Sequence, residues 1–177
     1  MSNKFIYRLS PAEKENIASN LIGILENDSA IEKRTAEFIS NWILTDASEK
    51  RKAFFDVWDI VLRNYLPQTR PVLFRSCNRI GRKDKLASFT GRIDEAKRIG
   101  QGKGLILICN TAESLKFEDQ LYQTGNYQNT FYPLASVLRK SRILNDSMFS
   151  DRLLDYEMED EYIMRIRTEK MHVLKWA

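Results

Sequence analysis

The 177-residue sequence contains few of the residues that build common metal sites. Cys77 and Cys109 are its two cysteines and His172 is its one histidine, so they cannot supply an ordinary zinc site of cysteine and histidine ligands. We expect both cysteines to be small buried hydrophobic residues, because neither stands in a local signature of a catalytic cysteine. Their spacing leaves a catalytic cysteine–histidine pair open as the alternative. The sequence predicts no metal.

Long hydrophobic runs are also missing. No apolar stretch approaches the roughly 20 residues that a membrane-spanning helix needs. The first residues, 1–4, lack the charged-then-apolar plan of a secretory signal. We therefore expect no membrane association and a cytoplasmic location. Hydrophobic residues make up 43% of the chain and charged residues 29%, which is ordinary for a globular protein and excludes a disordered one.

The net charge of +4 is unevenly distributed along the chain. Segment 70–103 has ten basic residues and three acidic ones, whereas segment 146–161 has seven acidic residues and one arginine, Arg152. If the fold brings these segments together, one wall can hold phosphate groups while the other stabilises positive charge. The alternative is that both segments are solvated faces whose charges balance.

Three amphipathic helices are predicted in the first part of the chain. Ser-Pro-Ala-Glu at 10–13 is a capping box with proline at the first helical position, and it predicts a helix that ends near residue 27. Ser-Ala-Ile-Glu at 29–32 repeats the pattern and predicts a second helix that ends near residue 44. Asp46 or Ser48 can cap a third helix, which Pro67 ends.

After residue 67 the pattern changes to short strands. We expect strands at 71–76, 86–90, 105–109, 162–166 and 172–176, the last two as a closing hairpin. Short helices are expected at 92–99 and 133–140. The glycines at 100, 102 and 104 precede a strand, so they are not a dinucleotide-binding loop, which follows a strand and opens a helix. The sequence therefore predicts an α+β fold, with an N-terminal helical region at 1–67 and a core at 68–177 as one compact unit.

Three features stand in one order in the predicted core. Arg75 lies on the first strand, Ser-Phe-Thr at 88–90 forms the next strand with a helix behind it, and Glu-x-Glu at 159–161 opens a late strand. This order resembles the arginine, Ser-x-Ser/Thr, Glu-x-Glu pattern of the mono-ADP-ribosyltransferase family. Tyr156, an aromatic residue three positions before the first glutamate, extends the resemblance. One position departs from it, because Ser76 follows the arginine where the family often has glycine.

The resemblance covers about residues 72–176 and implies a split, mostly antiparallel β-sheet around a cleft for NAD+. It implies transfer of ADP-ribose, with release of nicotinamide, onto a macromolecular acceptor. That acceptor is either a protein arginine, which Glu-x-Glu most often accompanies in the family, or RNA or another nucleic acid, whose phosphates the basic residues at 70–103 could position. The helical region ahead of the first strand is similar to small phage-encoded transferases and to related toxins.

The resemblance also gives the two glutamates their roles. Glu161 binds the ribose 2′-hydroxyl and stabilises the oxocarbenium-like sugar, because a fixed carboxylate gains attraction as positive charge develops. Glu159 orients the nucleophile of the acceptor, and a carboxylate suits an arginine there because it pairs well with a guanidinium. The two carboxylates are the catalytic residues of this interpretation.

Four further residues complete the predicted site. Arg75 holds a phosphate of NAD+ through its planar fork, which a lysine could not reproduce. Ser88 donates a hydrogen bond to Glu161 and fixes its rotamer, while Thr90 shapes the nicotinamide pocket from the same strand face. Tyr156 stacks on the acceptor or packs the acidic segment.

A second hypothesis treats the chain as a non-enzymatic basic module that binds a nucleic acid or a protein. Its three helices would then form a partner-binding face, as in an antitoxin or a regulatory protein, and the acidic segment at 156–161 would be a solvated loop. This hypothesis predicts no affinity for NAD+ and no loss of function in Glu161→Ala. It also predicts weaker binding after changes at Arg79, Arg82 or Lys83.

Overall fold

The structure is a computed structural model, and it describes residues 7–81, 85–116 and 130–176. Arg82, Lys83 and residues 1–4, on which some of the expectations above rest, lie outside the described residues. The chain divides into two compact units, one of Met1–Val61 with Val137–Asp155 and one of Leu62–Ser136 with Tyr156–Ala177. The later segment of the first unit was assigned to the core by the sequence, which placed a single boundary at residue 67. In the described part of the chain no helix is long and apolar enough to cross a membrane.

The first unit is helical. Its elements are α1 (Pro11–Glu26), α2 (Lys33–Leu44), the 3-10 helix η1 (Ala47–Glu49), α3 (Lys52–Asn64), α7 (Leu134–Leu144) and α8 (Asp151–Leu154), of which α3 and α7 continue into the second unit. Their apolar faces meet in an aromatic core, where Trp42 and Trp58 pack edge to face at 5.7 Å between ring centroids. The helical spacing of the sequence predicted these two rings as core, and their burial confirms it.

The start of α1 confirms the predicted capping box. The Ser10 side chain accepts from the Glu13 N–H at 3.2 Å, and the Ser10 N–H donates to the Glu13 carboxylate at 2.7 Å. The predicted cap of the third helix is wrong, because neither Asp46 nor Ser48 begins it. These residues belong to η1 and its entry, and α3 begins at Lys52.

The second predicted capping box is also wrong. Helix α2 has Glu32 as its N-cap, without a side-chain cap. The cause is the buried Asn20 of α1, whose side chain accepts from the Glu32 N–H at 3.1 Å and donates to the Ala30 carbonyl at 2.9 Å. The entry into α2 is therefore fixed by a residue of another helix, so Ser29 does not cap it.

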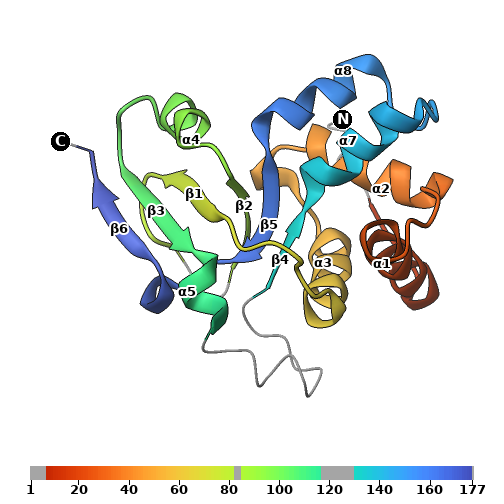
Figure 1. Cartoon of the computed structure of the whole chain (residues 1–177), viewed down its shortest axis with the longest axis horizontal. Coiled ribbons are helices and arrows are strands. Elements are labelled where there is room, and N and C mark those ends of the chain that lie inside the picture. The colour runs from red at the N-terminus through yellow and green to blue at the C-terminus, as the bar shows by residue number, and fades with distance from the viewer. Residues whose placement is uncertain (1–6, 82–84, 117–129, 177) are drawn as a thin grey trace, which may run out of the picture. The chain divides into compact units, whose positions relative to one another are not determined.

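The second unit is built on an antiparallel sheet of six strands in the order β4-β5-β2-β1-β3-β6 (Figure 1). The strands are β1 (Val72–Cys77), β2 (Leu86–Thr90), β3 (Leu105–Asn110), β4 (Phe131–Pro133), β5 (Glu161–Arg165) and β6 (His172–Lys175). The other elements are α4 (Ile93–Gly100), α5 (Thr111–Lys116) and the 3-10 helices η2 (Asp155–Glu159) and η3 (Thr168–Lys170). The fold class is α+β, as predicted.

The predicted closing hairpin is wrong. Strand β5 pairs with β4 and β2, so both of its edges are occupied, and β6 pairs with β3 at an edge of the sheet. Met171, which directly precedes β6, packs against the apolar core of the sheet. The sequence correctly predicted both strands but could not predict their partners.

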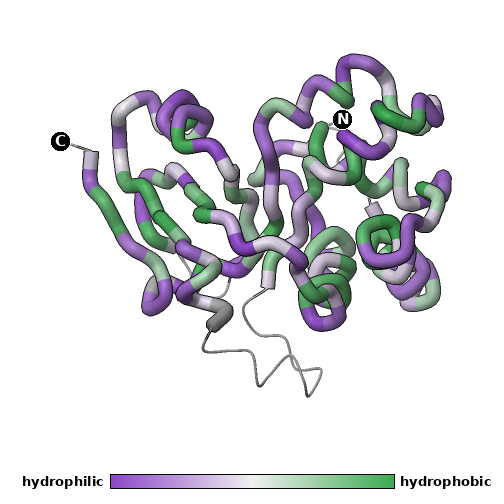
Figure 2. Tube along the Cα trace, viewed as in Figure 1, coloured by the Kyte–Doolittle hydropathy of each residue, from purple (hydrophilic) through white to green (hydrophobic). Residues whose placement is uncertain are grey.

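The sheet divides between β1 and β2. Among the described residues these strands pair at a single position, Phe74 with Thr90, whereas β1 runs beside β3 and β2 beside β5 along their lengths. One apolar core spans the division and includes Leu73, Phe89 and Leu107. In Figure 2 the strand β3 is mostly hydrophobic, as its place inside the sheet requires. The pairing agrees with the expectation of a split, mostly antiparallel sheet.

Candidate functional site

The three predicted motifs lie on neighbouring strands. Strand β2 lies between β1, which carries Arg75, and β5, which begins at Glu161. In the ladder, Thr90 of β2 lies opposite both Phe74 of β1 and Glu161 of β5. Residues that are far apart in the sequence therefore meet at one level of the sheet.

Ser88 and Glu161 are joined by a hydrogen bond. Because side chains alternate along a strand, Ser88 and Thr90 leave β2 on one face, and Glu161, which lies opposite Thr90, leaves β5 on that same face. The Ser88 hydroxyl donates to Glu161 Oε1 at 2.5 Å. This contact restricts the rotamer of the carboxylate, which is the geometry that the resemblance implied.

Arg75 bridges the division between β1 and β2. Phe74 shares a sheet face with Thr90, so Arg75 starts on the opposite face, and its Nη1 donates to the Ser88 carbonyl at 2.7 Å. Its Nε is buried without a hydrogen-bond partner among the described residues. Burial lowers the pKa of Arg75, and nearby groups, Glu161 among them, oppose that shift. A guanidinium keeps its charge in proteins, so a fixed positive group lies near Glu161.

The segment that carries the two glutamates is held by the residues that follow β2. The predicted loop at 156–161 is instead the 3-10 helix η2, followed by Asp160 in the left-handed region at φ 48° and by β5. Three donors on segment 90–92 reach three successive carbonyl groups: Thr90 Oγ1 to Glu159 at 2.7 Å, the Gly91 N–H to Asp160 at 3.1 Å, and Arg92 Nη1 to Met158 at 3.0 Å. The backbone beside both glutamates is thereby fixed to the end of β2.

The hydroxyl of Thr90 makes two hydrogen bonds within the protein. It donates to the Glu159 carbonyl, accepts from the Arg92 N–H at 3.0 Å, and belongs to a side chain that is only 6% exposed. Its polar atom is therefore used within the protein, and Thr90 is a positioning residue for the glutamate segment.

Gly91 fits this arrangement because it has no side chain. A Cβ at this position would collide with the carboxylate of Asp160, and it would lie 3.3 Å from the Tyr162 ring. We expect Gly91→Ala to displace the Asp160 carboxylate and to lower the free energy of unfolding by about 1 kcal/mol. Thermal or urea unfolding measures this loss. Gly81→Ala is the matched control, because a Cβ at Gly81 meets no described atom within 4 Å. Equal stability of Gly91→Ala and wild type would contradict the geometry.

Glu159 is half-exposed and lies beside an arginine of α4. Its side chain retains 40% of its exposure, and its Oε1 lies 3.6 Å from Arg98 Nη2. Burial raises the pKa of Glu159 and the charge of Glu161 raises it further, while Arg98 opposes both. The carboxylate can therefore meet an external group and exchange a proton nearer to neutral pH than an ordinary glutamate does.

Tyr156 is not joined to the other predicted site residues. It lies half-buried in η2, and its side chain forms no hydrogen bond or ring contact with a described residue. Ser76, where the family pattern often has glycine, packs against α4, and its hydroxyl occupies the place that a Cβ on Gly100 would need. The Ser76 side chain therefore fits at this position because residue 100 of α4 is a glycine.

Sequence reasoning missed four residues around the site. Gly91, Arg92 and Asp160 hold the glutamate segment, and Arg98 contacts Glu159. Gly91 could have been found, because a glycine directly after a strand often marks a close approach of another backbone. The other three act through contacts between distant segments, for which the sequence carries no local signal.

The alternative of a catalytic cysteine–histidine pair is not met by the geometry. Cys109 is buried as predicted, while Cys77 is half-buried, and burial raises the pKa of both thiols, which disfavours the reactive thiolate. His172 lies opposite Ile108 in the ladder, so it leaves the sheet on the face opposite to Cys109. Across the described residues, no group of three or more metal-ligating side chains is placed to hold an ion.

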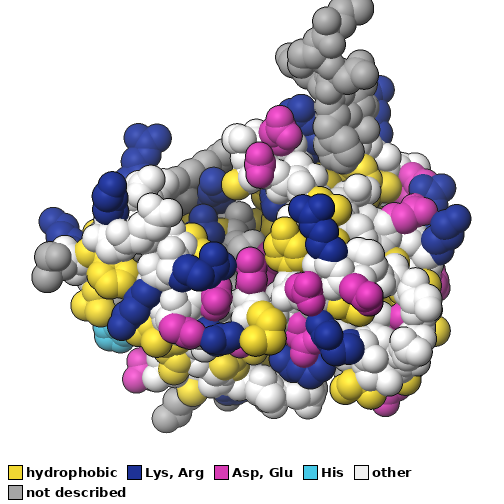
Figure 3. All heavy atoms as spheres, turned by 90° about the horizontal axis from the view of Figure 1, so that it is seen from above, with side chains coloured by type: hydrophobic (Ala, Val, Ile, Leu, Met, Phe, Trp, Pro, Cys, Tyr) yellow, Lys and Arg dark blue, Asp and Glu magenta, His cyan; other side chains and the backbone are white. Residues whose placement is uncertain are grey.

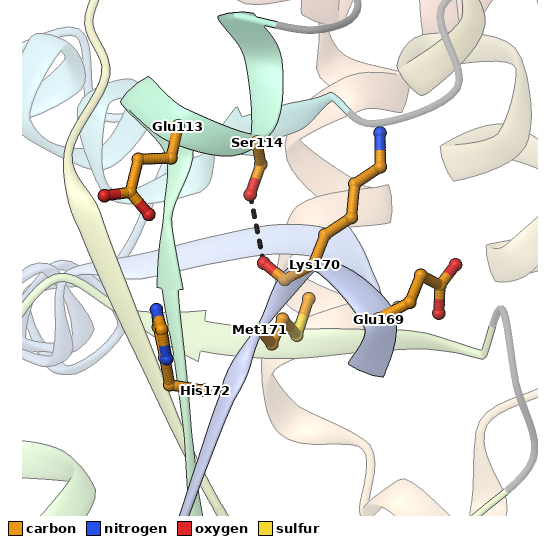
Figure 4. A pocket seen from close by; sticks show the side chains of 6 residues that line it. All are labelled: Glu113, Ser114, Glu169, Lys170, Met171 and His172. Atoms are coloured by element: carbon orange, nitrogen blue, oxygen red, sulfur yellow. Dashed lines mark hydrogen bonds between the residues drawn. The ribbon is translucent and has the colours of Figure 1, made fainter.

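A pocket of about 350 Å³ lies in the same unit, next to α5, η3 and the start of β6 (Figure 4). Its described lining consists of Glu113, Ser114, Glu169, Lys170, Met171 and His172. The Ser114 hydroxyl donates to the Lys170 carbonyl at 3.1 Å, and in Figure 4 this bond lies between Glu113 and His172 on one side and Glu169 on the other. None of these six belongs to the arginine, Ser-x-Thr or Glu-x-Glu motifs, so the motifs and this pocket are separate features.

Comparison of the sequence with protein-family models, with curated proteins and with solved structures finds no match.

Proposed function

We propose that the protein is an NAD+-dependent mono-ADP-ribosyltransferase that transfers ADP-ribose to a macromolecular acceptor. The observation that carries the proposal is the hydrogen bond from Ser88 to Glu161, with Arg75 bound to the carbonyl of the same serine. It joins the arginine, Ser-x-Thr and Glu-x-Glu motifs in one place, which their order in the sequence did not require. A cytoplasmic location and a phage or toxin setting belong to the same proposal.

Glu161 would act on the ribose that carries nicotinamide. When the bond between C1 of this ribose and the nicotinamide nitrogen breaks, the electron pair leaves with neutral nicotinamide and positive charge develops on the sugar. The Glu161 carboxylate, held by Ser88, attracts that charge more strongly in the transition state than in the ground state. Glu159, two residues before Glu161 at the end of η2, then orients the acceptor and can take its proton.

Arg75 would hold a phosphate of NAD+ with the part of its guanidinium that the protein leaves unused. Nη1 is bound to Ser88, whereas Nε has no partner among the described residues. A buried donor without a partner costs about 1–3 kcal/mol, and an oxyanion that reached the Nε–Nη2 edge would remove this cost. The Arg75 Nε–H, which has no partner among the described residues, thus supports a ligand with anionic oxygens, such as a pyrophosphate.

The charge of the second unit supports an acceptor or partner with acidic character. Its sequence has 16 basic and 11 acidic residues, so it carries the whole positive net charge of the chain. Figure 3 shows both basic and acidic side chains at the surface.

The experiment that tests the proposal uses NAD+ labelled in its adenylate moiety, a cell extract and the purified protein. We expect label to enter macromolecules, and digestion with protease or with nuclease then identifies the acceptor class. Absence of both label and nicotinamide release, from protein shown to be folded, would exclude the enzyme.

The charge distribution also favours a second candidate, a basic module that binds nucleic acid without chemistry. It predicts RNA binding that weakens as salt rises and is unchanged in Glu161→Gln. Binding measured at two salt concentrations, beside the NAD+ assay, separates the two candidates, because only the enzyme requires the carboxylate.

The raised pKa of Glu159 gives a pH prediction. A carboxyl whose pKa is raised keeps its proton to a higher pH than free glutamic acid, so lowering the pH neutralises Glu159 before an ordinary glutamate. We expect transfer to an arginine analogue to fall with a midpoint above the usual value of 4.5. Rates measured from pH 4 to 8 check this, and Glu159→Gln should remove the fall in rate at low pH. If Glu159→Gln showed the same dependence of rate on pH as wild type, the fall at low pH would belong to another group.

A further inference from the structure

The contact between Arg98 and Glu159 places a guanidinium at the carboxylate that would receive the acceptor. Arg98 lies on α4, its side chain is 61% exposed, and its Nη2 lies 3.6 Å from Glu159 Oε1. Glu95, one turn earlier on the helix, holds Arg98 Nε at 3.0 Å and Nη2 at 2.8 Å. The third nitrogen, Nη1, forms no hydrogen bond with a residue that the structure describes.

We propose that Arg98 is an internal acceptor, so that the protein ADP-ribosylates its own guanidinium at this position. The inference rests on the proposed function, in which Glu159 orients an acceptor nucleophile. A carboxylate pairs well with a guanidinium, so Glu159 suits an arginine acceptor. The Arg98 guanidinium already lies 3.6 Å from the Glu159 carboxylate. The same contact that orients an external arginine would therefore orient this one.

The step balances without a further reactant. Arg98 Nη1 forms a bond to C1 of the nicotinamide ribose as the C1–nitrogen bond to nicotinamide breaks, and nicotinamide leaves with that electron pair. The guanidinium loses one proton, to Glu159 or to water, and nothing is oxidised or reduced. The product keeps a guanidinium that carries ADP-ribose.

Two fixed elements set the geometry of this step. The backbone of Glu159 is held by Thr90 and the Arg98 side chain is held by Glu95, so the acceptor and the carboxylate that orients it are positioned within one unit of one chain. Holding reactants in place makes the step effectively unimolecular. The fraction of protein modified per unit time should therefore be the same across about a hundredfold range of protein concentration.

The test incubates the purified full-length protein with labelled NAD+ and no added acceptor, and maps the modified residue by peptide mass spectrometry. Arg98→Lys is compared with Arg79→Lys, which removes another exposed arginine of the same unit that has no described contact with Glu159. Agmatine, a small guanidine, is added in a parallel reaction as an external acceptor. Glu161→Gln shows whether any label depends on the proposed chemistry.

We expect label on Arg98, a loss of at least about tenfold in Arg98→Lys, and no change in Arg79→Lys. Modification of agmatine should persist in Arg98→Lys, because the chemistry of the site is intact. Label on other residues, or modification of agmatine without modification of Arg98, would overturn the internal acceptor while leaving the proposed function. Absence of nicotinamide release under all conditions would overturn both.

Discussion

Glu161→Gln is expected to lower the rate of nicotinamide release from NAD+ about a thousandfold. At about 4 Å and an effective dielectric constant near 20, a carboxylate attracts a developing unit charge by roughly 4 kcal/mol. Glutamine keeps the size of the side chain and can still accept the hydrogen bond of Ser88, so the change removes charge and little else. Initial rates of nicotinamide release, measured by chromatography, check this expectation.

Glu157→Gln is the matched control, because it removes the same charge from the same short segment. Its backbone carbonyl, which accepts the Asp160 N–H at 3.0 Å, is unchanged. We expect wild-type rates in this variant and unchanged thermal unfolding in both. If Glu161→Gln released nicotinamide at the wild-type rate, Glu161 would not be the stabilising carboxylate. Equal losses in the two variants would indicate a general effect of segment charge.

Arg75→Ala is expected to raise the KM for NAD+ about tenfold to a hundredfold, because a hydrogen bond to a charged group is worth about 1.5–3 kcal/mol. Arg75→Lys should recover only part of this loss, since a lysine keeps the charge but not the planar fork. Steady-state rates as a function of NAD+ concentration separate KM from kcat.

The same substitution also removes a structural contact. Without Arg75 the Ser88 carbonyl loses its donor, and we expect stability to fall by about 1 kcal/mol. Arg79→Ala removes an exposed arginine of the same unit as a control. A KM unchanged in Arg75→Ala, in protein that remains folded, would confine Arg75 to bridging β1 and β2.

The strands of the second unit could be predicted from the sequence because each is a short apolar run ended by turn residues. Their pairing could not be predicted, since it depends on which edges are occupied. β5 lies between β4 and β2, which leaves β6 to pair with β3 and excludes the expected hairpin. Strand β4 was missed because it has three residues and ends in Pro133, a length at which no period can be recognised.

The site was predictable to the extent that its residues form ordered motifs on strands. The contact of Ser88 with Glu161 follows from such a motif, because alternate residues of paired strands share a face. The role of Thr90 did not follow, since its hydroxyl is used by a carbonyl of segment 158–160, which is far away in the sequence. Arg98 was not identifiable either, because its charge pattern with Glu95 is that of any exposed helix.

The measurement that tests the central claim most directly is a crystal structure of the Glu161→Gln variant with NAD+, in which cleavage is slow enough for the intact dinucleotide to bind. We expect the nicotinamide ribose within hydrogen-bond distance of residue 161 and a phosphate at the Nε–Nη2 edge of Arg75. NAD+ in the pocket lined by His172, or no bound NAD+ at millimolar concentration, would contradict it.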